Sequence, residues 1–147
     1  MSQTYTQNVV HIVFSTKDRR GSIPNELGPR LWTYMTGICA NFGIKVHAVR
    51  GTADHAHLLI QLPPTVTLAK AVLTIKANSS RWMGTFDRAF AWQKGYAAFS
   101  VSHSMIPTVA RYINNQEKHH AKAGFDAEFV SLLKKHEIEF EQCYVFG

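Results

Sequence analysis

The order in which strand patterns and helix patterns follow one another is the feature that most restricts the fold of this chain. Strand segments, rich in β-branched and apolar side chains, alternate with segments whose apolar side chains recur at helical spacing. Thr67 stands where a helix N-cap is expected. The predicted strands cover residues 5–16, 44–52, 55–62 and 95–102, and the two helices between them cover residues 24–42 and 67–83.

This βαββαβ order is that of the ferredoxin-like arrangement, an α+β fold with a four-stranded antiparallel sheet and two helices on one face. The spacing predicts two further helices, over residues 104 to about 120 and about 126–136, and the open face is available to the first of these or to a ligand. The length of 147 residues suits one domain. We divide it into a core of residues 1–102, a helix over 103–122, and a C-terminal helix with an acidic tail over 123–147.

The third predicted strand alternates between two faces. Ala56, Leu58 and their successors at every second position are uniformly apolar, so this face should pack against the helices. His55 and His57 then project from the open face, with their Cβ atoms about 6.5–7 Å apart. That spacing allows both imidazoles to bind one divalent metal ion. The alternative is a chance histidine pair on a strand.

A second group of polar residues lies in the predicted helix over 104–120. Tyr112 and Gln116 are four residues apart, so on a helix they share one face. A tyrosine in such a position is commonly part of the core, which is the alternative interpretation. The polar neighbours Arg111, Asn114 and Asn115 favour a functional role.

Charge is distributed unevenly along the chain. The net charge is +6, with 14 Lys and Arg against 5 Asp and Glu in residues 1–122, and 2 against 5 in residues 123–147. A basic body indicates a polyanionic partner such as nucleic acid, although ordinary solubility charge explains it equally well. No apolar run is long enough to span a bilayer, no signal peptide opens the sequence, and the two cysteines form no framework. We therefore expect a cytoplasmic protein.

Three segments together resemble one protein family. They are His55-Ala56-His57, residues 92–102 (WQKGYAAFSVS) and residues 112–120 (YINNQEKHH). The family is that of the single-tyrosine HUH transposases of small insertion sequences, which move as single-stranded DNA, and the resemblance covers nearly the whole chain. Ala56 departs from the bulky hydrophobic residue that the family name implies. Because alanine is apolar and faces away from the histidines, the site should tolerate it.

The resemblance implies a mechanism for this chain. Tyr112 would attack a phosphodiester of single-stranded DNA and form a 5′-phosphotyrosine link, while His55, His57 and Gln116 would hold a divalent ion, Mg²⁺ or Mn²⁺. Such a cation would neutralise phosphate charge and help a phenol of ordinary pKa near 10 to attack. The resemblance also implies hairpins at the element ends as the substrate, and a homodimer in which the tyrosine acts in cis or in trans.

Other polar residues have weaker assignments. His11 is expected beside the third strand, in a structural or supporting role, and Asp54 is expected in a turn. His119 and His120 are expected to be solvated or to contact DNA. Trp82, Trp92 and Tyr96 are candidates for base stacking, with Trp82 favoured for the core. The candidate phosphate contacts are Lys17, Arg19, Arg20, Lys76, Arg81, Lys94 and Arg111.

Three other functions compete with transposition. A nucleic-acid-binding module without chemistry uses the same fold, but would present aromatic residues on its central strands, where this sequence presents histidines. A metal-dependent hydrolase would use the two histidines and leave Tyr112 unexplained. A domesticated relative would process repeated palindromes by the same chemistry as the transposases.

Overall fold

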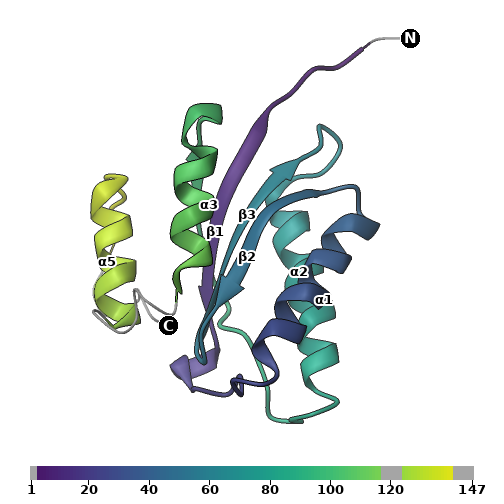
Figure 1. The fold of residues 1–147 in the computed structure, drawn as a ribbon, viewed down its shortest axis with the longest axis vertical. Coiled ribbons are helices and arrows are strands. Elements are labelled where there is room, and N and C mark those ends of the chain that lie inside the picture. The colour runs from purple at the N-terminus through teal and green to yellow at the C-terminus, as the bar shows by residue number, and fades with distance from the viewer. Residues whose placement is uncertain (1–2, 117–123, 141–147) are drawn as a thin grey trace.

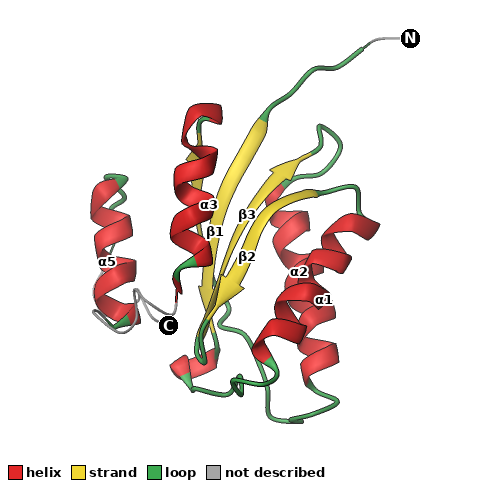
Figure 2. Cartoon of the chain, in the orientation of Figure 1, coloured by secondary structure: helices red, strands yellow, loops and turns green. Residues whose placement is uncertain are grey.

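The computed structural model describes residues 3–116 and 124–140, which form a four-stranded antiparallel sheet between two layers of helices (Figures 1 and 2). The strand order is β2-β3-β1-β4, as the ferredoxin-like arrangement requires, so the predicted fold class is confirmed. The strands are β1 (Asn8–Ser15), β2 (Lys45–Gly51), β3 (His55–Leu62) and β4 (Ala97–Val101). The helices are α1 (Gly28–Asn41), α2 (Leu68–Met83), α3 (Ile106–Asn114) and α5 (Phe125–Lys135), with short 3₁₀ turns at Lys17–Arg19 and His103–Met105.

The main core lies between the sheet and the helices α1 and α2. Ala56, Leu58 and Ile60 project from β3 into this layer, where they meet Leu31 and Ile75. All five side chains are almost completely buried. The predicted assignment of the two faces of β3 is therefore confirmed, and it directs His55 and His57 to the opposite side of the sheet.

The opposite face is covered by α3 and α5 (Figure 1). Ile113 of α3 packs against Leu59 of β3. Phe129 and Leu133 of α5 pack against Val13 of β1 and against β4. The helices α3 and α5 thus cover this face of the sheet, and His55 and His57 lie between the two helices.

Several element boundaries differ from the prediction. The helix expected over 104–120 ends at Asn114, and Asn115 forms its C-cap with φ −106° and ψ 23°. The first helix begins at Gly28 instead of residue 24, because Pro29 is tolerated only in a first turn. The predicted N-cap is confirmed, since the Thr67 hydroxyl accepts a hydrogen bond of 3.1 Å from the Lys70 amide.

Two further findings complete the fold. The predicted hairpin is present, with an irregularity in β2 between Val46 and Ala48. Within the described ranges, no helix has both the length and the apolar character needed to cross a membrane. His119, His120 and Cys143 lie outside the described residues.

Candidate metal and nucleophile site

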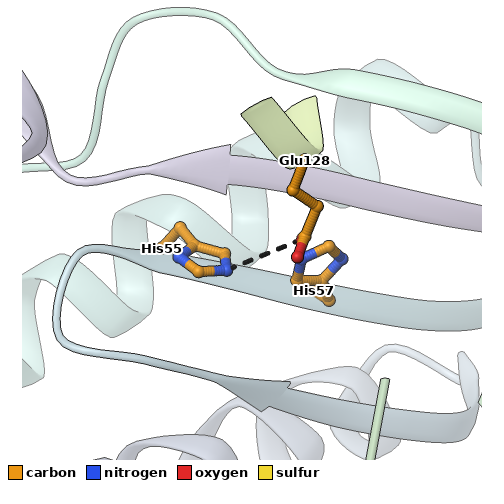
Figure 3. A group of neighbouring side chains, drawn as sticks. All are labelled: His55, His57 and Glu128. Atoms are coloured by element: carbon orange, nitrogen blue, oxygen red, sulfur yellow. Dashed lines mark hydrogen bonds and ion pairs between the residues drawn. The ribbon is translucent and has the colours of Figure 1, made fainter. Parts of the chain in front are cut away.

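The strand β3 brings His55 and His57 together on the face covered by α3 and α5. Both side chains are completely buried, and their ring centroids lie 5.1 Å apart. Figure 3 shows Glu128 of α5 reaching toward both imidazoles from the opposite side. Glu128 Oε1 lies 2.7 Å from His57 Nε2 and 4.0 Å from His55 Nε2.

Gln116 joins this group from the chain that follows α3. Its side chain is buried, and its amide nitrogen donates a hydrogen bond of 3.5 Å to the backbone carbonyl of Tyr112. That bond directs the amide oxygen toward His55, where Oε1 lies 3.2 Å from Nε2. The structure therefore brings together His55, His57 and Gln116, the three residues predicted as ligands.

The second nitrogen of His55 is held by the turn before β3. His55 Nδ1 lies 2.8 Å from Asp54 Oδ1 and 2.9 Å from the hydroxyl of Thr52. Because a carboxylate oxygen only accepts, Nδ1 carries the proton, and in neutral His55 the lone pair sits on Nε2. Asp54 is thus more than the turn residue that the sequence indicated, since it fixes the tautomer of a proposed ligand.

His11 of β1 contacts the second nitrogen of His57. His11 Nε2 lies 2.9 Å from His57 Nδ1, and the two rings are stacked. Burial, reinforced by the adjacent His57, lowers the pKa of His11 to about 3, so its ring is neutral and its Nε2 can either donate to or accept from His57 Nδ1. The contact places His11 against a proposed ligand, as a supporting role requires.

Tyr112 approaches the same group from α3. Its ring centroid lies 5.8 Å from that of His57 and 6.3 Å from that of His11. Burial raises the pKa of the Tyr112 phenol above its usual range, and the negative charge of Glu128, which also accepts a hydrogen bond from the phenol, raises it further. A hydrogen bond with Gln116 acts in the opposite direction. The phenol therefore needs a cation or a proton acceptor nearby in order to react as a nucleophile.

These donor atoms fit a divalent metal ion. Neutral His55 Nε2 and Gln116 Oε1 are both lone-pair acceptors, yet they face each other at 3.2 Å, which is an arrangement that a cation stabilises. Ligands bound about 2.1 Å from an octahedral ion lie about 3 Å from their neighbours. Three separations within the group, His57–Glu128 at 2.7 Å, His55–Gln116 at 3.2 Å and His55–Glu128 at 4.0 Å, are close to that geometry. His55, His57 and Glu128 each offer one ligand atom, and these atoms lie within 4.8 Å of one another.

Glu128 is the site residue that the sequence analysis missed. It lies twelve positions beyond Gln116 in a segment regarded as an acidic tail with its helix, and an acidic residue in the first turn of a helix needs no function. A signal was present in the sequence, because Glu128 is followed at helical spacing by Leu132, so it faces the same side as the apolar stripe. The sequence does not show which residues Glu128 contacts, because those contacts form only when α5 docks on the sheet.

The predicted DNA contacts lie on both sides of the sheet, and Lys76 and Arg81 are on α2, across the sheet from the site. Lys17, Arg19 and Arg20 follow β1, and Arg19 forms an ion pair with Asp126 of α5. Lys76 is half-buried, and its ammonium group donates hydrogen bonds of 2.8 Å and 2.6 Å to the carbonyls of Gln93 and Gly95. The side chains of Arg81, Lys94 and Arg111 are exposed, on α2, in the loop before β4 and on α3, respectively.

The three aromatic candidates for base stacking also differ in their exposure. Trp92 is buried against Phe14 and Phe90, with its indole nitrogen donating to the Ser79 hydroxyl at 2.9 Å, so it is not available for stacking with a base. Trp82 stacks on Tyr34 at the edge of the helical layer. Tyr96 is exposed.

Comparisons with known proteins point in one direction. The profile of the family described as "Transposase IS200 like" matches residues 4–116. The chain is similar to the ISDra2 transposase TnpA of Deinococcus radiodurans R1, with 24% identity over 119 residues, 72% of this chain and 81% of that protein.

Two solved structures share the fold. One is a Deinococcus radiodurans R1 protein assigned to the transposases, with a TM-score of 0.63, 22% identity, and coverage of 79% of this chain and 96% of that one. The other is a REP-associated tyrosine transposase bound to a REP hairpin, with a TM-score of 0.61, 14% identity, and coverage of 85% and 74%.

Proposed function

Because the chain belongs to the IS200-like transposase family, we propose that it cleaves and rejoins single-stranded DNA through a covalent link between Tyr112 and a 5′ phosphate. The observation that carries this proposal is the convergence of a tyrosine phenol on a buried group of metal-binding atoms. A nucleic-acid-binding module without chemistry has no use for two buried histidines held by Asp54 and His11.

In this proposal, His55, His57 and Gln116 hold a divalent ion, Mg²⁺ or Mn²⁺, and Glu128 adds a carboxylate to their set. The ion would supply positive charge to the phosphate oxygens and to the departing 3′ oxygen. Asp54 keeps the proton of His55 on Nδ1, which faces away from the ligand atoms, and the contact with His11 would orient the ring of His57. Carboxylate and amide oxygens suit a hard cation, while imidazoles also accept softer ones.

The phenol oxygen of Tyr112 attacks the phosphorus atom, the bond from phosphorus to the 3′ oxygen breaks, and the fragment on the 3′ side of the break stays linked to the tyrosine through its 5′ phosphate. Glu128, which accepts a hydrogen bond from the phenol, receives the proton of Tyr112. The departing oxygen takes up this proton, from Glu128 or through solvent water, and becomes a 3′-OH. Attack by another 3′-OH reverses these steps and joins a new strand. The phosphodiester energy is conserved in the covalent link, so no ATP is required.

We further propose that the substrate carries hairpins near the cleavage points. The similar transposase bound to a REP hairpin supports this, as does the basic character of residues 1–122. Lys17, Arg20 and Arg111 would contact phosphates with the other exposed basic residues, and a homodimer would hold two ends together. The same chemistry would serve a domesticated relative that processes repeated palindromes.

The test incubates the protein with Mg²⁺ and single-stranded DNA copied from the flanks of its gene. We expect an adduct that survives denaturation, is absent with EDTA, and does not form on duplex DNA of the same sequence. Tyr112→Phe should abolish it, whereas Tyr34→Phe, a matched change at an exposed tyrosine of α1, should not. His55→Ala and His57→Ala should each prevent cleavage and retain hairpin binding. An adduct on Tyr112→Phe would exclude Tyr112 as the nucleophile.

A further inference from the structure

A large cavity adjoins the metal and nucleophile site. It has a volume of about 940 Å³ and lies between the start of α1, the turn from β2 to β3, and the end of α3. Gln116 and Thr52 line the cavity and also contact His55, one on each imidazole nitrogen. The volume is within the range of about 300–1,000 Å³ that is typical of ligand pockets. A ligand in this cavity would therefore lie one side chain away from His55.

The chemistry of the walls favours a neutral, polar ligand. Asn25, Asn114 and Asn115 supply amide groups, each able both to donate and to accept hydrogen bonds. Among the described lining residues, Arg50 alone carries a charge, and its Nη1 already donates to the Val49 carbonyl at 2.8 Å. A phosphate pocket would present several cationic groups. Paired amides instead match the edge of a nucleobase.

The indole of Trp32 provides an independent indication of a ligand. Trp32 lines the cavity with only 5% of its surface exposed, and within residues 3–116 and 124–140 its indole N–H makes no hydrogen bond. A Cβ at Gly28 would lie 3.6 Å from the indole nitrogen, so the absence of a side chain there leaves this edge uncovered. Buried donors are rarely left without an acceptor. A base carbonyl or ring nitrogen in the cavity would supply one.

We propose that this cavity binds one unpaired nucleobase of the DNA strand, at a position next to the cleaved phosphate. The Trp32 indole N–H would donate to the base, and the asparagine amides would read its edge. The inference rests on the proposed function, because it assumes that a single DNA strand occupies the neighbouring site. The proposed contact would recognise the identity of a base, whereas the other contacts proposed above position the DNA backbone.

Binding of an oligonucleotide series tests the proposal. Each probe is the gene-flank DNA with one abasic site, which removes a base and keeps the backbone charge. Dissociation constants are measured with the Tyr112→Phe protein, so that no strand is cut. We expect one position near the cleavage point where base removal weakens binding by about tenfold or more. At that position, a methylphosphonate linkage should have a smaller effect than base removal.

Two variants connect that position to the cavity. Gly28→Leu places a side chain beside the indole, and it should weaken binding of intact DNA and abolish further loss at the sensitive abasic position. Gly37→Leu is the control, because it lies in the same helix and a Cβ there meets nothing within 4 Å. Trp32→Phe removes the donor and retains an aromatic ring, and should reduce the abasic effect partially. Thermal melts confirm that each variant is folded.

An NMR measurement keeps the test independent of any folding defect. In the ¹⁵N-labelled Tyr112→Phe protein, the Trp32 indole N–H signal, assigned with Trp32→Phe, should shift when intact DNA binds and stay in place with the sensitive abasic probe. Equal losses at every abasic position, or an unmoved signal with intact DNA, overturn the nucleobase pocket. If the wild-type protein still forms its adduct in that case, the proposed function stands. Absence of both DNA binding and adduct overturns both proposals.

Discussion

The turn that presents His55 depends on a glycine, and replacing Gly51 with alanine tests how this turn is built. A Cβ at Gly51 would lie 2.2 Å from the backbone oxygen of His55 and 2.6 Å from Cη2 of Trp32. The same His55 oxygen accepts a hydrogen bond of 3.0 Å from the Thr52 amide, which closes the turn. The new methyl group therefore meets a backbone atom that is already fixed by the hairpin.

The magnitude follows from these distances. Ordinary contacts of a Cβ lie at 3.4–4 Å, so the His55 carbonyl or the alanine backbone has to move by more than about 1 Å. Overpacking of this kind destabilises by about 1–3 kcal/mol, and weakening the hydrogen bond of the turn adds about 0.5–1.5 kcal/mol. We expect a total loss of about 1.5–4.5 kcal/mol. For a chain of this size, that lowers the melting temperature by roughly 3–18 °C.

The assay is urea unfolding followed by circular dichroism, with thermal melts in parallel. Gly37→Ala is the control, because its Cβ would meet nothing within 4 Å and it should stabilise α1 by about 0.5–1 kcal/mol. Adding Trp32→Phe to Gly51→Ala should recover only part of the loss, since the His55 carbonyl remains in place. A Gly51→Ala protein within about 0.5 kcal/mol of wild type would refute the reasoning.

Three further predictions concern the site, a helix cap and a buried amine. Glu128→Gln should weaken Mn²⁺ binding, measured by calorimetry, by about tenfold or more. The control Glu139→Gln, at an exposed position, should not change the affinity. Equal Mn²⁺ affinities of Glu128→Gln and wild type would remove Glu128 from the ligand set. Thr67→Ala should lower the free energy of unfolding by about 1 kcal/mol in urea, because the Lys70 amide loses its partner, and an unchanged midpoint would contradict the cap. Burial lowers the pKa of Lys76 to about 8, so between pH 8 and the ordinary value of about 10.4 the unfolded chain binds more protons, and stability should rise with pH. Lys76→Met should flatten that rise, and an identical slope in both proteins would argue against the lowered pKa.

The sheet and the direction of the two histidines were predictable, because both depend on short-range patterns. In β3, every second residue from Ala56 is apolar, and that alternation fixes which face meets α1 and α2. The cap at Thr67 is similarly local, since its hydroxyl bonds three residues away. The start of α1 was predicted about one helical turn too early, because the helical pattern is weak around Pro29.

The rest of the site depends on contacts between distant segments. Glu128 meets His57 only because Phe129 and Leu133 dock α5 on β1 and β4, and nothing near Glu128 in the sequence specifies that docking. The contact of Gln116, beyond the end of α3 at Asn114, with His55 also joins segments that lie far apart in the sequence. The cavity beside Trp32 combines three segments that lie far apart along the chain, so no local pattern reveals it.

The most direct test of the central claim is to identify the residue that carries the DNA. The adduct formed with Mg²⁺ is digested with protease and nuclease, and the modified peptide is sequenced by mass spectrometry. The account predicts a single modified peptide containing Tyr112, with a nucleotide joined to the phenol oxygen through its 5′ phosphate, and a free 3′-OH on the other DNA fragment. A nucleotide on any other residue, or a link through a 3′ phosphate, would contradict it.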